Sequence, residues 1–141
     1  MSAPTSASPS APASVIPDSH ADLLQRPLFG HLGTLRPDGT VQVNPVWFRW
    51  DGELLWFTTE KRRHKYRNIT ENPQATLSVN DPDQPYRYLE VRGVIEEIVD
   101  DTSTDGFFTL ADRYGMSFER PIPDAPHRVL LGLRPRHATF Q

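Results

Sequence analysis

The sequence has no cysteine among its 141 residues. A chain without thiols has no disulfide framework, no thiolate metal site and no cysteine nucleophile. It also lacks any apolar run near the roughly 18 residues that a membrane-spanning helix needs, and its N-terminus has neither the basic start nor the apolar stretch of a secretory signal. We therefore expect a cytoplasmic protein that does not bind a membrane.

Several catalytic and nucleotide-binding motifs are absent as well. The sequence contains no glycine-rich phosphate loop, no G-x-G-x-x-G after a strand and no serine nucleophile elbow. These absences disfavour nucleotide hydrolysis, Rossmann-type dinucleotide binding and α/β-hydrolase chemistry. The five histidines are scattered and show no metal-ligand spacing such as H-x-x-x-H, so we expect no metal site.

Positive charge is concentrated in one place. The chain as a whole is acidic, with a formal net charge of −3 and a pI near 5.9, which argues against nucleic acid as a partner. Yet five of its 15 Lys and Arg residues fall within a cationic block, residues 61–68, directly after the strand-like run 54–59. The block follows Thr58 and Thr59 and opens an expected helix. Hydroxyls and cations at a helix start suit a phosphate, whereas the simpler interpretation is a solvated helix face.

The chain divides into two parts. Residues 1–17 are nearly all Ser, Ala, Pro and Thr and cannot bury enough apolar surface to offset the entropy of ordering, so we expect a disordered tail. Residues 18–141 are expected to form one domain. Within it we expect a short helix that ends before Pro27, strands at 28–35, 40–50, 53–59, 75–79, 86–98 and 127–133 with a continuation over 136–140, helices at 62–71 and 101–114, and loops at 80–85 and 115–126.

The turns and breaks in these strands indicate the fold class. Turn residues at 36–39 and 51–52 connect the first three strands into an antiparallel meander. Pro45 inside the second strand implies an edge or a bulge because it lacks an N–H, and Gly93 is a candidate bulge. Six to seven strands with short helices predict a mainly β protein. Closure removes exposed sheet edges, so we expect an antiparallel split β-barrel with helices at the barrel ends.

The motifs and their order resemble those of the pyridoxamine 5′-phosphate oxidase-like, FMN-binding split β-barrel superfamily. The matching segments are Gly-Thr-Leu at 33–35, Asp-Gly at 38–39, Gln-x-Asn-Pro-Val-Trp-Phe at 42–48, Trp-Phe-Thr-Thr at 56–59, Arg-x-Lys-x-x-Asn-Ile at 63–69 and Val-x-Gly at 91–93. The resemblance implies a homodimer with two cofactor sites at the subunit interface. It also implies a phosphate pocket at Thr58, Thr59, Arg63 and Lys65, and a strand that contacts the isoalloxazine ring largely through its backbone at Gln42, Val43, Asn44, Pro45 and Val46.

Within this superfamily the chain looks most like the reductases that use the deazaflavin coenzyme F420. The resemblance implies hydride transfer between F420 and an unsaturated small organic molecule, such as an enone, an imine or a quinone-like acceptor. The remaining cations Lys61, Arg62 and Arg67 would favour the anionic polyglutamate tail of F420 over FMN, which has no such tail.

Neither the residues nor the resemblance require a catalytic acid. The catalytic residues are therefore left unassigned, with His31, Tyr86 and Tyr88 as candidate proton donors. Loops at 81–85 and 118–126 are expected to set substrate selectivity. Three other functions stay open: an FMN-dependent oxidase or reductase of the same fold, a non-catalytic flavin- or haem-binding split barrel, and a small β-barrel that binds nucleic acid through the cationic block.

Overall fold

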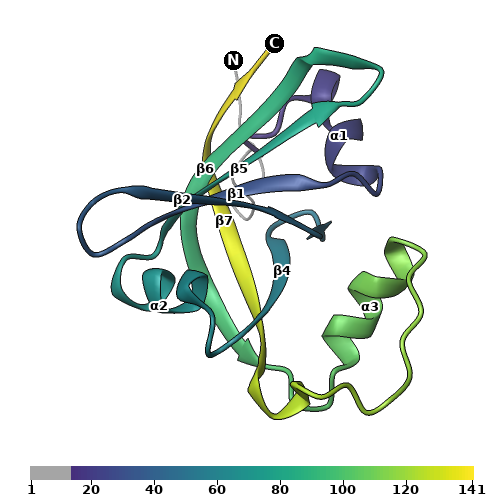
Figure 1. Ribbon diagram of the computed structural model, residues 1–141. Coiled ribbons are helices and arrows are strands. Elements are labelled where there is room, and N and C mark those ends of the chain that lie inside the picture. Colours follow the sequence, from purple (N-terminus) through teal and green to yellow (C-terminus); the bar gives the residue numbers. More distant parts are fainter. Residues whose placement is uncertain (1–13) are drawn as a thin grey trace, which may run out of the picture.

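The computed structural model describes residues 14–141, which form one antiparallel sheet with short helices around it (Figure 1). The expected tail at residues 1–13 lies outside the described part, and Ile16, which the expected tail also included, is buried in the core. The seven strands lie in the order β2-β1-β5-β6-β7-β4-β3 and curl into a half-barrel, which confirms the predicted mainly β fold class. The strands are β1 (Gly30–Leu35), β2 (Val41–Val46), β3 (Arg49–Trp50), β4 (Leu55–Glu60), β5 (Gln74–Asp81), β6 (Gln84–Asp100) and β7 (Arg128–Phe140).

The alternation of side chains along each strand decides which face of the sheet is buried. In β5, Ala75, Leu77 and Val79 are buried while the residues between them are partly exposed, as expected when successive side chains point to opposite faces. Leu131 and Leu133 of β7 continue the same inner face. The core therefore fills the inside of the curl, with further contributions from Leu32, Leu55, Phe57, Leu89 and Val91.

The first three predicted strands do not form a meander. β1 pairs with β2, and the end of the predicted strand 40–50 pairs with β4 across the turn at 51–52, both as predicted. However, β2 itself does not pair with β4, which pairs with β7 at the other end of the sheet, so the prediction of one continuous meander was wrong. The predicted strand 40–50 breaks after Val46, and its end forms the short β3, which pairs with β4. Between them the chain turns inward and buries Phe48 completely. Pro45 lies in an edge strand, as predicted, where its missing N–H breaks no ladder.

β5 and β6 form one long hairpin, so the loop predicted at 80–85 was wrong. β5 extends to Asp81, whose carboxylate accepts the N–H of Asp83 at 2.9 Å and closes a tight turn. The register of β6 against β7 shifts between Arg92 and Gly93, so the predicted irregularity is present there, but the extra residue is Arg136 on β7. Gly93 lies opposite Pro135, so the bulge accommodates the missing N–H of this proline and β7 continues without a break.

Short helices lie around the sheet: η1 (Asp18–His20), α1 (Asp22–Gln25), α2 (His64–Glu71), α3 (Asp105–Arg113) and η2 (Ala125–His127). α2 packs Ile69 into the main core, and α3 packs Phe107 into a second, smaller cluster. Both begin later than predicted; before α3, Asp101 stays outside the helix and accepts the N–H groups of Gly106 and Phe107. α2 and α3 lie on opposite sides of β4 (Figure 1). No helix within residues 14–141 is long and apolar enough to cross a membrane.

Candidate functional site

A polar cavity of about 310 Å³ lies where the two ends of the curled sheet approach each other. Edge strand β2 forms one wall, the end of β4 forms the opposite wall, and the start of α2 closes one side. The curl brings these segments together although β2 and β4 do not pair. Every residue predicted to bind the cofactor lines this cavity except Val43 and Val46. The full lining is Gln42, Asn44, Pro45, Thr58, Thr59, Glu60, Arg63, His64, Lys65 and Arg128.

The two exceptions follow from the alternation of side chains along β2. Gln42 and Asn44 line the polar cavity, whereas Val43 points to the other face and is 57% exposed. Val46 is buried and lines a second cavity instead. The side chain of Val43 is therefore not positioned to bind a ligand in this cavity.

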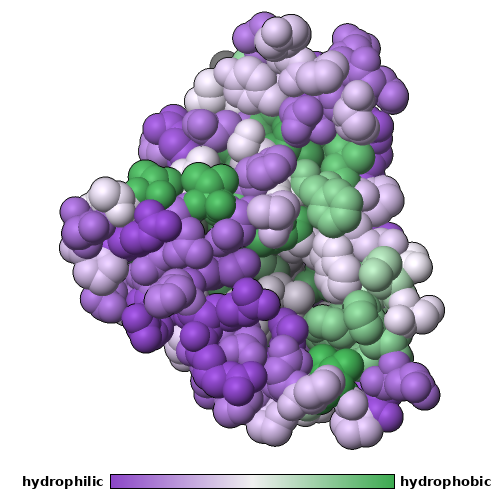
Figure 2. Space-filling view, viewed as in Figure 1, coloured by the Kyte–Doolittle hydropathy of each residue, from purple (hydrophilic) through white to green (hydrophobic). Residues whose placement is uncertain are grey.

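The second cavity, of about 420 Å³, continues from the polar one toward α3. Pro45, Thr58, Lys65 and Arg128 line both cavities, so the two form one groove. Figure 2 shows hydrophilic residues gathered over α2, hydrophobic residues over α3 and a hollow between them. We call the two parts of the groove the polar end and the aromatic end. The aromatic end is completed by Phe29, Val46, Trp47, Phe107 and Phe118.

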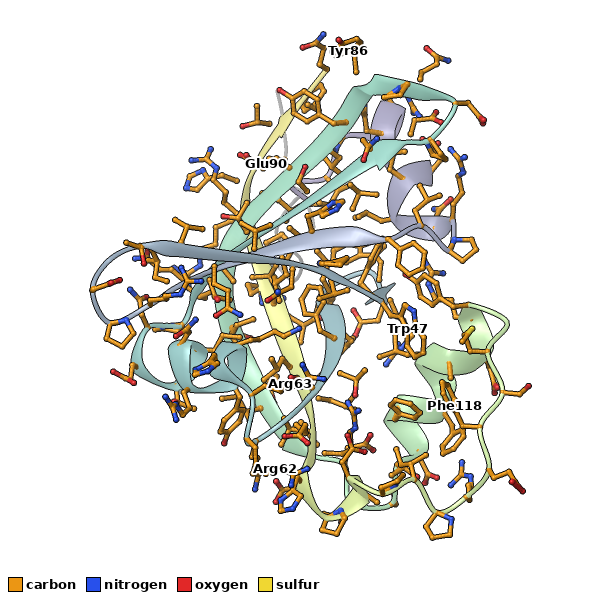
Figure 3. The ribbon with its side chains drawn as sticks, in the orientation of Figure 1. Trp47, Arg62, Arg63, Tyr86, Glu90 and Phe118 are labelled. Atoms are coloured by element: carbon orange, nitrogen blue, oxygen red, sulfur yellow. The ribbon has the colours of Figure 1, made fainter. Side chains whose placement is uncertain are left out.

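Trp47 is held in place at the aromatic end. It stacks on Tyr114 with 5.5 Å between ring centroids, and the ring centroid of Phe118 lies 6.4 Å from that of Trp47. The Tyr114 hydroxyl donates to the carbonyl of Leu28 at 2.7 Å, and burial raises the pKa of Tyr114, so the hydroxyl stays protonated and serves the structure. Figure 3 shows Trp47 and Phe118 on the α3 side of the groove, across from Arg63.

The polar end carries positive charge without a full set of counter-ions. Burial lowers the pKa of Lys65, and the charges of Arg63 and Arg128 lower this pKa further. Arg128 has a partner, since its Nη2 lies 2.8 Å from Oδ2 of Asp124, and it also donates to Thr58 at 3.3 Å. Among residues 14–141, neither Arg63 nor Lys65 forms an ion pair. An anion bound here would gain charge-assisted hydrogen bonds and relieve the repulsion among the cations.

Two cations of the block lie outside the groove and are paired. Lys61 Nζ lies 3.0 Å from Asp100. Arg62 donates to both carboxylate oxygens of Glu60, at 3.1 and 2.6 Å, and so holds the pKa of Glu60 below its usual value. Because Arg62 compensates Glu60, this carboxylate does not oppose an anion in the cavity that it lines. Figure 3 shows Arg63 beside the groove and Arg62 nearer the lower edge, so the expected role of Lys61 and Arg62 in binding a cofactor tail has no support.

Arg67, the remaining cation of the block, lines a neighbouring cavity of about 370 Å³. This cavity shares Gln42 and His64 with the polar end, so it adjoins the groove directly. Arg36 and Glu71 also line it. Two guanidinium groups against one carboxylate leave this neighbouring cavity cationic.

The N-terminus of α2 adds to the attraction for an anion. Its N-cap residue is Arg63, and no side chain caps the helix there. His64 and Lys65, the first two helical residues, both line the polar end. The backbone N–H groups of a first helical turn have no partner within the helix, and the helix dipole favours negative charge at this point.

The candidate proton donors do not reach the groove. Tyr86 is 86% exposed and lies at the far end of the molecule from Arg63 (Figure 3). His31 and Tyr88 line neither the polar nor the aromatic end. No side chain of this chain is therefore assigned as a proton donor. Within residues 14–141, no group of three or more His, Asp or Glu side chains is placed to hold a metal ion.

Sequence reasoning missed Arg128 and Phe107, whereas Phe118 begins a loop that was expected to set substrate selectivity. The pairing of β4 with β7 sets Arg128 opposite Glu60 and so brings it to the groove from far along the chain. No local pattern marks this residue beyond a cation near the start of the last predicted strand. Phe107 and Phe118 come from α3 and the connection after it, and their place depends on how α3 packs.

Comparison with known proteins gave matches of two kinds. The family model for pyridoxamine 5′-phosphate oxidase matches residues 16–141. A solved structure described as an F420 reductase is 51% identical, has a TM-score of 0.86, and matches over 89% of this chain and 100% of its own. No curated protein matched.

More distant structures share the fold alone. A conserved hypothetical protein from Mycobacterium tuberculosis is 23% identical with a TM-score of 0.67, over 88% of this chain and 83% of its own. A pyridoxamine 5′-phosphate oxidase-related, FMN-binding protein from Nostoc punctiforme is 19% identical with a TM-score of 0.64, over 89% of this chain and 84% of its own. The family match spans nearly the whole described chain and agrees with the resemblance seen in the motifs. The chain therefore belongs to the pyridoxamine 5′-phosphate oxidase family of split β-barrel proteins.

Proposed function

We propose that this protein is an oxidoreductase that binds coenzyme F420 in the groove and transfers a hydride between this deazaflavin and an unsaturated small organic molecule. An enone, an imine or a quinone-like compound is the expected substrate class. The observation that carries the proposal is a cavity with uncompensated positive charge that opens directly into an aromatic cavity. The 51% identity to a structure described as an F420 reductase supports the same cofactor.

The donors at the polar end fit the phosphate of such a cofactor. Arg63 and Lys65 supply positive charge, and Thr58 and Thr59 supply hydroxyl groups. The first turn of α2 supplies backbone N–H groups. The one carboxylate in the lining, Glu60, is already paired. The groups available to a ligand at this end therefore match an anion.

β2 and the aromatic end fit a planar ring system. Within residues 14–141, β2 pairs only with β1, so the N–H and C=O groups along its outer edge are open to the heteroatoms of a ring. Trp47 and Phe118 give the adjoining part of the groove an apolar lining that excludes water from a ring and an unsaturated substrate. When bound, F420 supplies the hydride chemistry itself. The residues of this chain hold the cofactor and orient the substrate beside it.

The neighbouring cationic cavity favours F420 over FMN. F420 carries a polyglutamate tail beyond its phosphate, whereas FMN ends at the phosphate. Arg36 and Arg67 line the cavity next to the polar end and would contact carboxylates of the tail. We expect their replacement by alanine to weaken F420 binding and leave FMN binding unchanged.

We also propose a homodimer whose second copy covers the open side of the groove. The support is exposed apolar surface beside it, where Phe29, Val41 and Val43 are 59%, 58% and 57% exposed. Light scattering on the purified protein tests this proposal. A mass twice that of the 16.0 kDa chain supports it, and a monomer at micromolar concentration contradicts it.

The experiment that tests the function is a fluorescence titration of the cofactor-free protein with F420, run in parallel with FMN. Micromolar or tighter binding of F420 with much weaker binding of FMN supports the proposal and leads to a screen of enone and quinone acceptors. Preference for FMN assigns the protein to a flavin-dependent activity instead. Binding of neither contradicts the proposed function.

A further inference from the structure

A chain of side-chain amides runs from α2 to the polar end of the groove. Asn68 of α2 is only 4% exposed. Its Nδ2 donates to Oγ1 of Thr34 at 3.2 Å and to Oε1 of Gln42 at 3.0 Å. Gln42 Nε2 in turn donates to Oδ1 of Asn44 at 3.0 Å. We call Asn68, Gln42 and Asn44 the amide relay.

The relay has a direction, because each amide has an oxygen that accepts and a nitrogen that donates. Asn68 uses both N–H groups, on Thr34 and Gln42, so the oxygen of Gln42 must face Asn68. The nitrogen of Gln42 must then face Asn44 and donate to its Oδ1. The group left over is the NH₂ of Asn44, which has no hydrogen-bond partner among residues 14–141.

Asn44 can present this NH₂ group to a ligand. Gln42 and Asn44 lie two residues apart on β2, so their side chains share a face, and both line the polar end. The cations there, Arg63, Lys65 and Arg128, also donate, and the carboxylate of Glu60 is already paired with Arg62. The relay therefore extends a surface of donors along the wall that β2 forms.

We propose that Asn68 is a positioning residue that sets the polarity of this wall. Acting through Gln42, it holds the Asn44 amide with its NH₂ toward the ligand, so that the site selects an oxygen acceptor, such as a ring carbonyl or a phosphate oxygen. The inference deepens the proposed function, and the identity of the ligand rests on that function. The direction of the relay does not depend on the proposed function.

The burial of Asn68 gives a physical reason for the relay to hold one arrangement. An amide buried without partners costs free energy, and the hydrogen bonds that Asn68 donates to Thr34 and Gln42 offset this cost. Rotating the Gln42 amide would set two NH₂ groups against each other. The hydrogen bonds of buried Asn68 thus orient the amide of Asn44, which is only partly exposed.

A double-mutant cycle on cofactor affinity tests the proposal. We expect Asn44→Leu to weaken binding about tenfold and Asn68→Ala about fivefold, as for the loss of one hydrogen bond. In the Asn44→Leu background, Asn68→Ala should change affinity by less than about twofold, because the group through which it acts is gone. Equal losses in both backgrounds would show a merely structural role and overturn the proposal.

A matched control lies on the same helical segment. Asn72 is the C-cap residue of α2, and its side chain accepts the N–H of Gln74 at 3.1 Å, outside the relay. Asn72→Ala removes the same kind of side chain and should leave cofactor affinity unchanged. A loss equal to that of Asn68→Ala would mean that any weakening of α2 affects binding, and would contradict the relay.

A second measurement does not depend on the cofactor. In nitrogen-15 spectra of the cofactor-free protein, the NH₂ hydrogens of Asn68 and Gln42 should exchange slowly with water, and those of Asn44 rapidly. Asn68→Ala should remove the protection of Gln42. An Asn44 NH₂ group as protected as that of Asn68 would overturn the proposal. If the wild-type protein binds neither F420 nor FMN, the proposed function fails, and these amide signals alone decide on the relay.

Discussion

The two ends of the groove are built in different ways. At the polar end, most ligand-facing groups come from two short stretches, β2 and residues 58–65, and the charges of Arg63 and Lys65 are left without carboxylate partners. At the aromatic end, the side chains come from four separate parts of the chain and pack on one another. The polar end therefore gives up electrostatic stability in the absence of a ligand, whereas the aromatic end stabilises the fold.

The largest expected effect is on ligand binding at the polar end. Replacing Arg63 and Lys65 together by alanine should weaken F420 binding by about 2–4 kcal/mol, because each charge-assisted contact contributes about 1.5–3 kcal/mol and the two effects overlap. Fluorescence titration measures the change. Lys61→Ala is the control, since Lys61 is paired with Asp100 outside the groove, and should leave affinity within about twofold. Unchanged affinity in the double variant would remove the phosphate assignment.

At the aromatic end the largest effect should be on folding. Phe107→Ala should lower the free energy of unfolding by about 3 kcal/mol, since this side chain is buried among Ala111, Ile122 and Trp47. Urea denaturation measures it. Phe118→Ala, at a side chain that is 42% exposed, should cost less than about 1 kcal/mol and instead raise KM for apolar substrates. Equal destabilisation by both variants would mean that Phe118 is part of the packed cluster rather than a wall of the groove.

Replacing Lys65 should have a smaller effect on stability, and it should stabilise the protein rather than destabilise it. Lys65→Met should stabilise the cofactor-free protein by about 0.5 kcal/mol at neutral pH, because it removes a half-buried charge beside Arg63 and Arg128. The pKa of Lys65 is lowered from 10.5, so the folded state releases this proton before the unfolded state does. As the pH rises toward 10.5, the free energy of unfolding of the wild-type protein should therefore approach that of the variant. Thermal denaturation across this range gives the difference, and a gap that widens with pH would contradict the assignment.

The smallest expected effect is a difference in how ligand binding at the two ends of the groove depends on salt. Raising the ionic strength from about 50 to about 200 mM should weaken F420 binding by about twofold, because salt screens the charges at the polar end. KM for an uncharged apolar substrate should stay constant over the same range. A KM that follows the salt dependence of F420 would show that the substrate, too, is held by charge.

Sequence alone could group most residues that line the polar end because they are close together in the chain. Thr58 and Thr59 precede the cationic block, and a strand followed at once by a helix keeps the two adjacent in space. The sequence does not show that Lys61 and Arg62 are paired with Asp100 and Glu60 and do not line the groove. A run of cations shows that charge is present, but pairing decides which charges a ligand meets.

Local pattern alone predicted the mainly β class, an edge or a bulge at Pro45 and an irregularity at Gly93, because each depends on the chemistry of residues close together in the chain. It did not establish that β4 pairs with β7, because strand pairing depends on which distant segments bury each other's apolar faces. That long-range pairing brings Arg128 to the polar end and leaves β2 and β4 facing each other unpaired. Most residues of the proposed cofactor site thus lie in short sequence motifs, whereas the groove that brings them together forms only because the sheet curls around its core.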